Sequence, residues 1–105
     1  MANADNQYSV IISDRASEML VSHARFLANV SAPAAQNLIN DFIISAKSLE
    51  SFPERNPWLT DSYVPINKYR KLVLCKRYLL IYQIKQTTVF VDFVLDCRQD
   101  YGWLV

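Results

Sequence analysis

The sequence predicts one α+β domain of order β-α-α-β-β-β, with a helical hairpin packed on one face of a twisted, mainly antiparallel sheet. Two observations carry this prediction. Residues 15–49 place apolar side chains at helical spacing, with one interruption at Pro33. Residues 69–101 instead read as three consecutive strands, rich in Val, Ile, Leu, Tyr and Phe and separated by short polar breaks. With 105 residues the chain fits a single domain, which we place at residues 8–105 after a flexible tail of residues 1–7.

The first two elements are predicted to be a short strand and an amphipathic helix. The strand covers residues 8–13, and Ser13 and Asp14 supply N-cap chemistry for a helix over residues 15–29. Side chains predicted to face the core are Tyr8, Val10 and Ile12 of the strand and Ala16, Leu20, His23, Leu27 and Val30 of the helix. His23 lies on this stripe, so we interpret it as a helix-face residue and not as a catalyst.

A second helix follows almost at once. Pro33 breaks the first helix and starts the second, because proline is tolerated only in the first turn. So short a break predicts an antiparallel hairpin. The stripe predicted to face the core is Ala35, Leu38, Ile39, Phe42, Ile43, Ala46 and Leu49. Prolines at positions 53 and 57 then end the helix in a loop, and Pro65 limits residues 63–66 to an edge segment at best.

Three strands complete the predicted sheet, at residues 70–74, 78–84 and 88–96. Their connections have hairpin length, which predicts antiparallel neighbours. In the middle strand, one face is predicted to carry Tyr78, Leu80, Tyr82 and Ile84. In the last strand, strict alternation places Val89, Val91, Phe93 and Leu95 on one face and Phe90, Asp92, Val94 and Asp96 on the other. Neither strand has a purely polar face, so we expect the face without helices to expose apolar surface for a partner.

The charge is distributed unevenly along the chain. The net charge is only +1, but residues 1–61 carry four basic and seven acidic side chains, whereas residues 62–105 carry seven basic and three acidic ones. Between residues 62 and 91 there are no acidic residues and six basic ones, namely Lys68, Arg70, Lys71, Lys76, Arg77 and Lys85. This asymmetry indicates an anionic partner. It is equally consistent with a solvated sheet edge that lysines keep from pairing.

Several functional classes are disfavoured by the composition. Cys75 and Cys97 are interpreted as reduced thiols within strands, and with a single histidine they do not supply a metal site. One glycine, Gly102, is too few for a phosphate-binding loop. No metal or cofactor is therefore expected. No apolar run approaches the ~18 residues that span a membrane, and no signal peptide is visible, so we expect a cytoplasmic protein.

Five segments, in their order and spacing, carry a resemblance to a known family. They are Tyr8–Ala16 (YSVIISDRA), Ser48–Pro53 (SLESFP), Tyr69–Leu72 (YRKL), Tyr78–Ile84 (YLLIYQI) and Val94–Tyr101 (VLDCRQDY). Together they resemble the RelE/ParE superfamily of bacterial type II toxins, the toxin components of plasmid-stabilisation modules. The resemblance covers nearly the whole chain from residue 8 and implies the same fold. It also implies a cognate antitoxin that wraps a segment over the toxin, and hence a toxin–antitoxin hetero-oligomer.

The superfamily divides by target. RelE-like members enter the ribosomal A site and cut mRNA, whereas ParE-like members inhibit DNA gyrase by protein contact alone. Attack by a ribose 2′-hydroxyl needs a proton acceptor, a proton donor and cations around the phosphate. Residues that match the RelE-like set are Arg70 or Lys71 on the second strand, Arg98 after the fourth strand, and Tyr101 as the aromatic residue.

One position departs from the RelE-like pattern. The third-strand arginine is expected directly after Tyr78, where this sequence has Leu79. Arg77 lies two residues earlier and, in ideal alternation, on the same face, so it is the candidate substitute. Further basic residues expected to contact RNA or another target are Lys68, Lys76 and Lys85. Three functions stay open: an mRNA endoribonuclease, a non-enzymatic inhibitor of gyrase, and a degenerate member that binds only its antitoxin or operator DNA.

Overall fold

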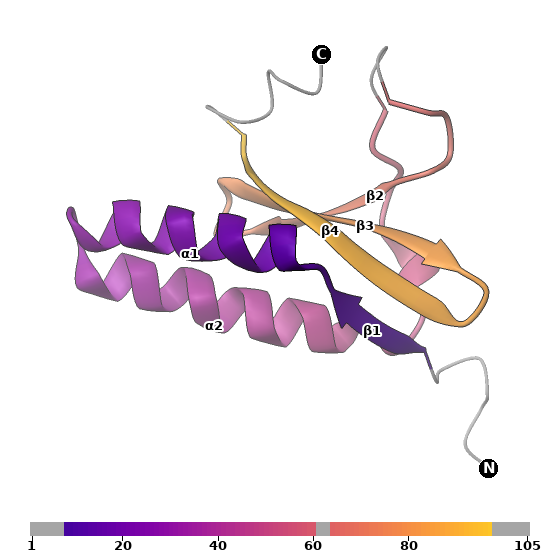
Figure 1. Cartoon of the computed structure of the whole chain (residues 1–105), viewed down its shortest axis with the longest axis horizontal. Coiled ribbons are helices and arrows are strands. Elements are labelled where there is room, and N and C mark those ends of the chain that lie inside the picture. The colour runs from indigo at the N-terminus through magenta and orange to yellow at the C-terminus, as the bar shows by residue number, and fades with distance from the viewer. Residues whose placement is uncertain (1–7, 61–63, 98–105) are drawn as a thin grey trace.

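A computed structural model describes residues 8–60 and 64–97, and these residues form the predicted order of elements (Figure 1). The elements are β1 (Ser9–Ile12), α1 (Asp14–Ala28), α2 (Ala32–Ser48), a 3-10 turn (Pro53–Arg55), β2 (Arg70–Leu74), β3 (Tyr78–Lys85) and β4 (Thr88–Asp96). The predicted tail of residues 1–7 lies outside the described residues, as do Arg98 and Tyr101. In the described part of the chain, no helix is both long and apolar enough to cross a membrane.

Both helices begin at serine caps, as the sequence predicts for the first. The Ser13 hydroxyl accepts a hydrogen bond from the Ala16 amide at 3.0 Å, and the Ser31 hydroxyl accepts one from the Ala34 amide at 3.2 Å. Pro33 lies in the first turn of α2, where its missing N–H costs nothing. Figure 1 shows the two helices side by side and running in opposite directions, which confirms the helical hairpin.

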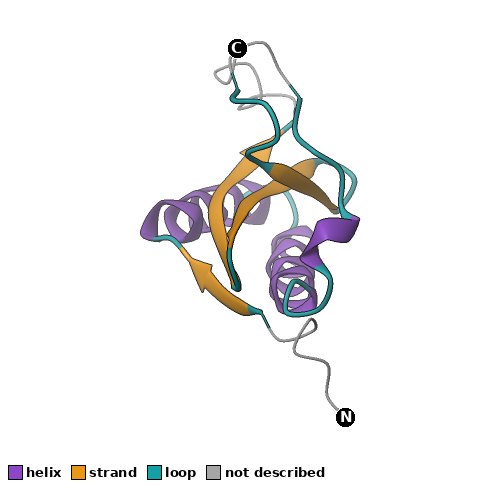
Figure 2. Ribbon diagram, turned by 90° about the vertical axis from the view of Figure 1, so that its right-hand side faces the viewer, coloured by secondary structure: helices purple, strands orange, loops and turns teal. Residues whose placement is uncertain are grey.

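The four strands have the spatial order β1-β4-β3-β2, and Figure 2 shows how strongly the sheet is twisted. β4, β3 and β2 are antiparallel neighbours, whereas β1 pairs with β4 in parallel, from Ser9 opposite Thr88 to Ile12 opposite Val91. The sheet is therefore mainly antiparallel, as predicted. The parallel pair brings the N-terminus of α1 against the middle of β4, because Ser13 follows β1 directly.

The main core lies between the helices and one face of the sheet. Its buried side chains are Ala16, Leu38, Phe42, Ala46, Leu49, Leu74, Tyr78, Leu80, Tyr82, Val89, Val91 and Val94. Three predicted core residues are instead exposed: Val30 is 78% exposed, Ile43 is 58% exposed and Ile12 is 39% exposed. Val30 lies beyond the C-cap at Asn29, so helical periodicity no longer places it. Ile43 lies at the flank of the apolar stripe, beside a shallow groove that it lines with Val10 and Ile12.

A β-bulge overturns the strict alternation predicted for the last strand. The register pairs Tyr82 with Val91 and Ile81 with Phe93, so Asp92 is an extra residue without a partner. Beyond the bulge every side chain changes sides. Val94 therefore joins Val89 and Val91 in the helix-side core, and Phe93 and Leu95 move to the opposite face.

That opposite face does not expose its apolar centre, contrary to the prediction. Leu79, Ile81, Phe93 and Leu95 are buried there together with Leu59. Met19 of α1, Val64 and Tyr69 pack against them. The loop after α2 folds back over the sheet, with the Leu59 amide bonded to the Tyr69 carbonyl at 2.7 Å. A β-bridge joins Trp58 to Arg70, and the Lys71 amide bonds to the Pro57 carbonyl at 3.0 Å, so residues 57–59 border the β2 edge.

Both cysteines lie in turns, and not in strands as predicted. Cys75 has a positive φ of 51° in the β2–β3 turn, and Cys97 directly follows β4. Both are exposed free thiols, but neighbouring atoms shield each sulfur from part of the surrounding water. This desolvation raises the pKa of each thiol, with a further contribution from Asp41 near Cys75 and from Asp96 near Cys97.

Candidate functional site

Arg70 bonds the loop that follows α2 to the edge of the sheet. Its Nη1 donates to the carbonyl oxygens of Glu54 at 2.9 Å and Asn56 at 2.6 Å, and the guanidinium lies 3.7 Å from the ring centroid of Trp58. An arginine whose planar group bonds two carbonyls and stacks on an indole is held in one place. Arg70 therefore supports the fold of the loop, on the side of the sheet that the helices cover.

Tyr82 holds the same loop from β3. Its hydroxyl donates to the Pro53 carbonyl at 2.5 Å and accepts from Asn56 Nδ2 at 3.0 Å. Burial raises the pKa of Tyr82 above its ordinary value, and the bond from Asn56 and the charge of Arg70 offset only part of this effect. The neutral phenol is thus the form that the fold favours.

We expect Tyr82→Phe to lower the free energy of unfolding by about 1–2 kcal/mol at pH 7, because Asn56 and the Pro53 carbonyl lose their common partner. The wild-type contribution is fully present below the unfolded tyrosine pKa, near 10, and is lost as the pH rises through the higher folded pKa. Urea unfolding at pH 7 and in the alkaline range measures both effects. Tyr69→Phe is the matched control, and an equal loss in that variant would contradict the assignment.

Arg70 and Lys71 point to opposite sides of the sheet. Arg70 shares its side with Leu72 and Leu74, which pack in the helix-side core, whereas Lys71 pairs in register with Ile81 on the other face. The two second-strand cations expected from the resemblance are therefore separated by the sheet. Of the two, Lys71 is the one on the same face as Leu79.

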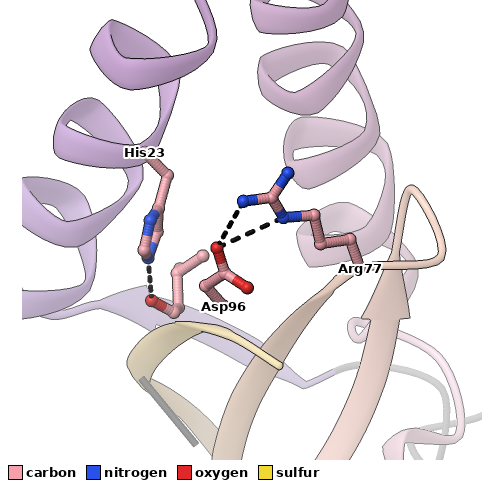
Figure 3. Close-up of polar contacts among 4 residues, drawn as sticks. His23, Arg77 and Asp96 are labelled. Carbon is pink, nitrogen blue, oxygen red and sulfur yellow. Dashed lines mark hydrogen bonds and ion pairs between the residues drawn. The ribbon is translucent and has the colours of Figure 1, made fainter. Parts of the chain in front are cut away.

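Arg77 does not take the direction predicted for it. Its Nη2 and Nε donate to Asp96 Oδ2 at 2.8 and 3.2 Å, and this bond raises the pKa of the guanidinium (Figure 3). Positive φ angles at Cys75 and Lys76 reverse the chain sharply, so ideal alternation does not extend to Arg77. Its side chain therefore turns to the helix side of the sheet. The Asp96 side chain that it neutralises is only 1% exposed.

His23 lies next to this ion pair and has a packing role. Its Nε2 is 2.9 Å from the Val94 carbonyl oxygen (Figure 3). Its ring lies 5.0 Å from that of Tyr78. The guanidinium of Arg77 lies 5.2 Å from the centroid of the same tyrosine ring. These contacts join α1 to β3 and β4, which agrees with the prediction of a helix-face histidine.

The remaining predicted site residues are not gathered at one point. Leu79 is 6% exposed and packs in the second apolar cluster, on the sheet face opposite the main core. Lys76 is in the β2–β3 turn and Lys85 ends β3, so they lie at opposite ends of that strand. Lys68 precedes β2 and lies 5.2 Å from the Tyr69 ring. Arg98 and Tyr101 lie outside the described residues.

Four side chains, of which the sequence pattern indicates only Lys68, form a row on the sheet face opposite the main core, where the first turn of α1 reaches Phe93. Lys68 Nζ lies over Tyr69, the Tyr69 ring meets the Phe93 ring edge-on at 6.0 Å, and Arg15 lies 5.0 Å from the centroid of Phe93. We call these four residues the cation–aromatic row. Beside them is a cavity of about 390 Å³, lined by Ser13, Arg15, Tyr69, Asp92 and Phe93. The charge asymmetry pointed only to Lys68, since Arg15 lies in the acidic half of the chain.

Comparisons with known proteins identify the family and a solved structure of the same fold. Residues 10–101 match the family model described as the ParE toxin of the type II toxin-antitoxin system parDE. A solved structure of the chromosomal ParDE system from P. aeruginosa superimposes with a TM-score of 0.71 at 15% identity, covering 87% of this chain and 97% of that one, and so shares its fold. A search of curated proteins found no match. The chain belongs to the ParE toxin family of type II toxin-antitoxin systems.

Proposed function

We propose that this toxin inhibits growth by binding a protein target, DNA gyrase, without chemistry of its own, and that a cognate antitoxin neutralises it. The observation that carries the proposal is Leu79. A buried leucine stands where a RelE-like ribonuclease places a phosphate-binding arginine, and it packs in a closed apolar cluster. The candidate substitute, Arg77, is bonded to Asp96 on the other side of the sheet.

Electrostatics supports the same proposal. Cutting RNA requires several cations that converge on one phosphate. Among the described candidates, Arg70 bonds loop carbonyls on the helix side and Arg77 neutralises Asp96. Lys71 lies on the opposite face of the sheet, with Ile81 as its cross-strand partner. Inhibition by contact needs no such convergence, because it requires only a complementary surface.

The apolar surface left by the fold supports an antitoxin partner. Exposed apolar side chains border the groove between β1 and α2, with Ile12 39% exposed and Ile43 58% exposed. The adjoining β1 is an edge strand. Such surface is costly to leave in water and usually marks a protein interface. A toxin–antitoxin hetero-oligomer accounts for it.

Expression of the toxin without antitoxin tests the proposal. We expect growth arrest with intact transcripts, and we expect the purified toxin to block supercoiling by gyrase holoenzyme in vitro. Co-expression of the cognate antitoxin should restore growth. Ribosome-dependent cleavage of mRNA with normal supercoiling would establish the ribonuclease instead, with Lys71, Arg98 and Tyr101 as the residues to mutate. Unimpaired growth and unimpaired supercoiling would indicate a degenerate member of the family.

A further inference from the structure

We infer that the cation–aromatic row and its cavity are the surface by which the toxin holds its protein target, and that they take an acidic peptide segment carrying an apolar side chain. The inference rests on the proposed function and specifies its binding site. Three segments that are distant in the sequence meet there: the first turn of α1, the loop before β2 and the middle of β4.

The row holds two cations against a pair of aromatic rings. Tyr69 and the buried Phe93 meet edge to face, and each ring has a cation near its centroid, at 5.2 Å for Lys68 and 5.0 Å for Arg15. Neither cation forms an ion pair within the described part of the chain. Their charges are thus positioned by the rings but not neutralised, which lowers the entropy lost when a carboxylate binds.

The β-bulge at Asp92 forms one wall of the cavity beside the cation–aromatic row. Asp92 has no partner in the register, but its carbonyl accepts from the Ser13 hydroxyl at 3.3 Å and its carboxylate accepts from Gln83 Nε2 at 2.6 Å. Ser13 also caps α1. The strand irregularity, the helix cap and the cavity are therefore one connected unit, and bulges of this kind commonly redirect side chains at binding sites.

Charge decides the class of partner. Arg15 and Lys68 attract carboxylates, and Lys71 adds a third cation on the same face of the sheet. Nucleic acid suits the cavity less well, because the Asp92 carboxylate lines it and would repel a run of phosphates. A peptide presents backbone N–H donors to Asp92 as well as carboxylates to the two cations, and its apolar side chain can rest against the half-buried Tyr69 ring.

Charge reversal of both cations tests the inference. We expect Arg15→Glu/Lys68→Glu to raise the toxin concentration for half-inhibition of gyrase holoenzyme by about 30-fold or more. Arg25→Glu/Lys47→Glu makes the same change of charge on the two helices, away from the row, and is expected to shift that concentration less than about 3-fold. Circular dichroism confirms folding, and the complex with the antitoxin is expected to form normally. Equal inhibition by the two variants would overturn the inference, as would loss of antitoxin binding with inhibition intact.

A direct binding measurement separates this inference from the proposed function. A synthetic peptide of alternating Glu and Phe is titrated into the wild-type toxin, and the Tyr69 and Phe93 amide signals are followed by NMR. We expect these signals to shift in the wild type and in the Arg25→Glu/Lys47→Glu control, and not in Arg15→Glu/Lys68→Glu. If wild-type toxin left gyrase unaffected but bound the peptide, only the choice of target would fail. Absence of shifts, or tighter binding of a single-stranded RNA at the row, would disprove the site.

Discussion

Replacement of Arg77 with alanine is expected to lower the free energy of unfolding by about 3 kcal/mol. The variant leaves the Asp96 carboxylate, which is 1% exposed, without the guanidinium that donates to it twice. Removing one partner of a buried ion pair costs ~3–5 kcal/mol. The lower end applies, because the Arg77 side chain is itself 25% exposed. Urea denaturation followed by circular dichroism measures the loss.

Two further variants define the cause of this effect. Lys76→Ala removes an exposed cation from the same turn and is expected to change stability by less than about 0.5 kcal/mol. Arg77→Met/Asp96→Leu removes both charges, and we expect it to recover much of the stability, because no carboxylate remains buried at this position. Equal losses for Arg77→Ala and Lys76→Ala would show that the ion pair has no structural role.

An arginine placed at position 79 is expected to lower the free energy of unfolding of the toxin without making it a ribonuclease. Leu79→Arg removes a buried side chain from its contacts and brings a guanidinium toward an apolar cluster. We expect a loss of about 3 kcal/mol in the free energy of unfolding. We also expect no ribosome-dependent cleavage of mRNA, because Arg70 and Arg77 lie on the other side of the sheet.

Val73→Arg is the matched control for this substitution. Val73 is the cross-strand partner of Leu79 and lies on the same face, but it is 56% exposed. An arginine there keeps its charge in water, so we expect a change within about 0.5 kcal/mol. Cleavage of mRNA by Leu79→Arg would contradict the non-enzymatic assignment. A loss of stability as large for Val73→Arg as for Leu79→Arg would contradict the buried cluster.

Local patterns determined a large part of this fold. Helical spacing and the serine caps predict both helices, and Pro33 predicts where the second begins, because these signals depend on neighbouring residues. Hairpin-length connections likewise predict the antiparallel order of the last three strands. Even so, Val30 and Ile43 are exposed, since an apolar residue at helical spacing is buried only where the partner surface reaches it.

The candidate site depended on contacts that no local pattern records. The sequence predicts that Arg77 lies with Leu79, yet two positive φ angles in the turn direct it to Asp96. The basic half of the chain indicates an interaction surface, but it does not indicate that Arg70 is bonded to loop carbonyls. Which cations remain available to a partner is decided only by packing.

The sequence by itself determined the class of fold, the two helices, the hairpin order of the last three strands and a surplus of cations in the second half. Only the tertiary structure decided the parallel β1–β4 pair, the bulge at Asp92 and the meeting of Arg15 with Phe93. The physical reason is separation along the chain. Ser13 and Asp92 are 79 residues apart, and their hydrogen bond exists only after the sheet has formed around it.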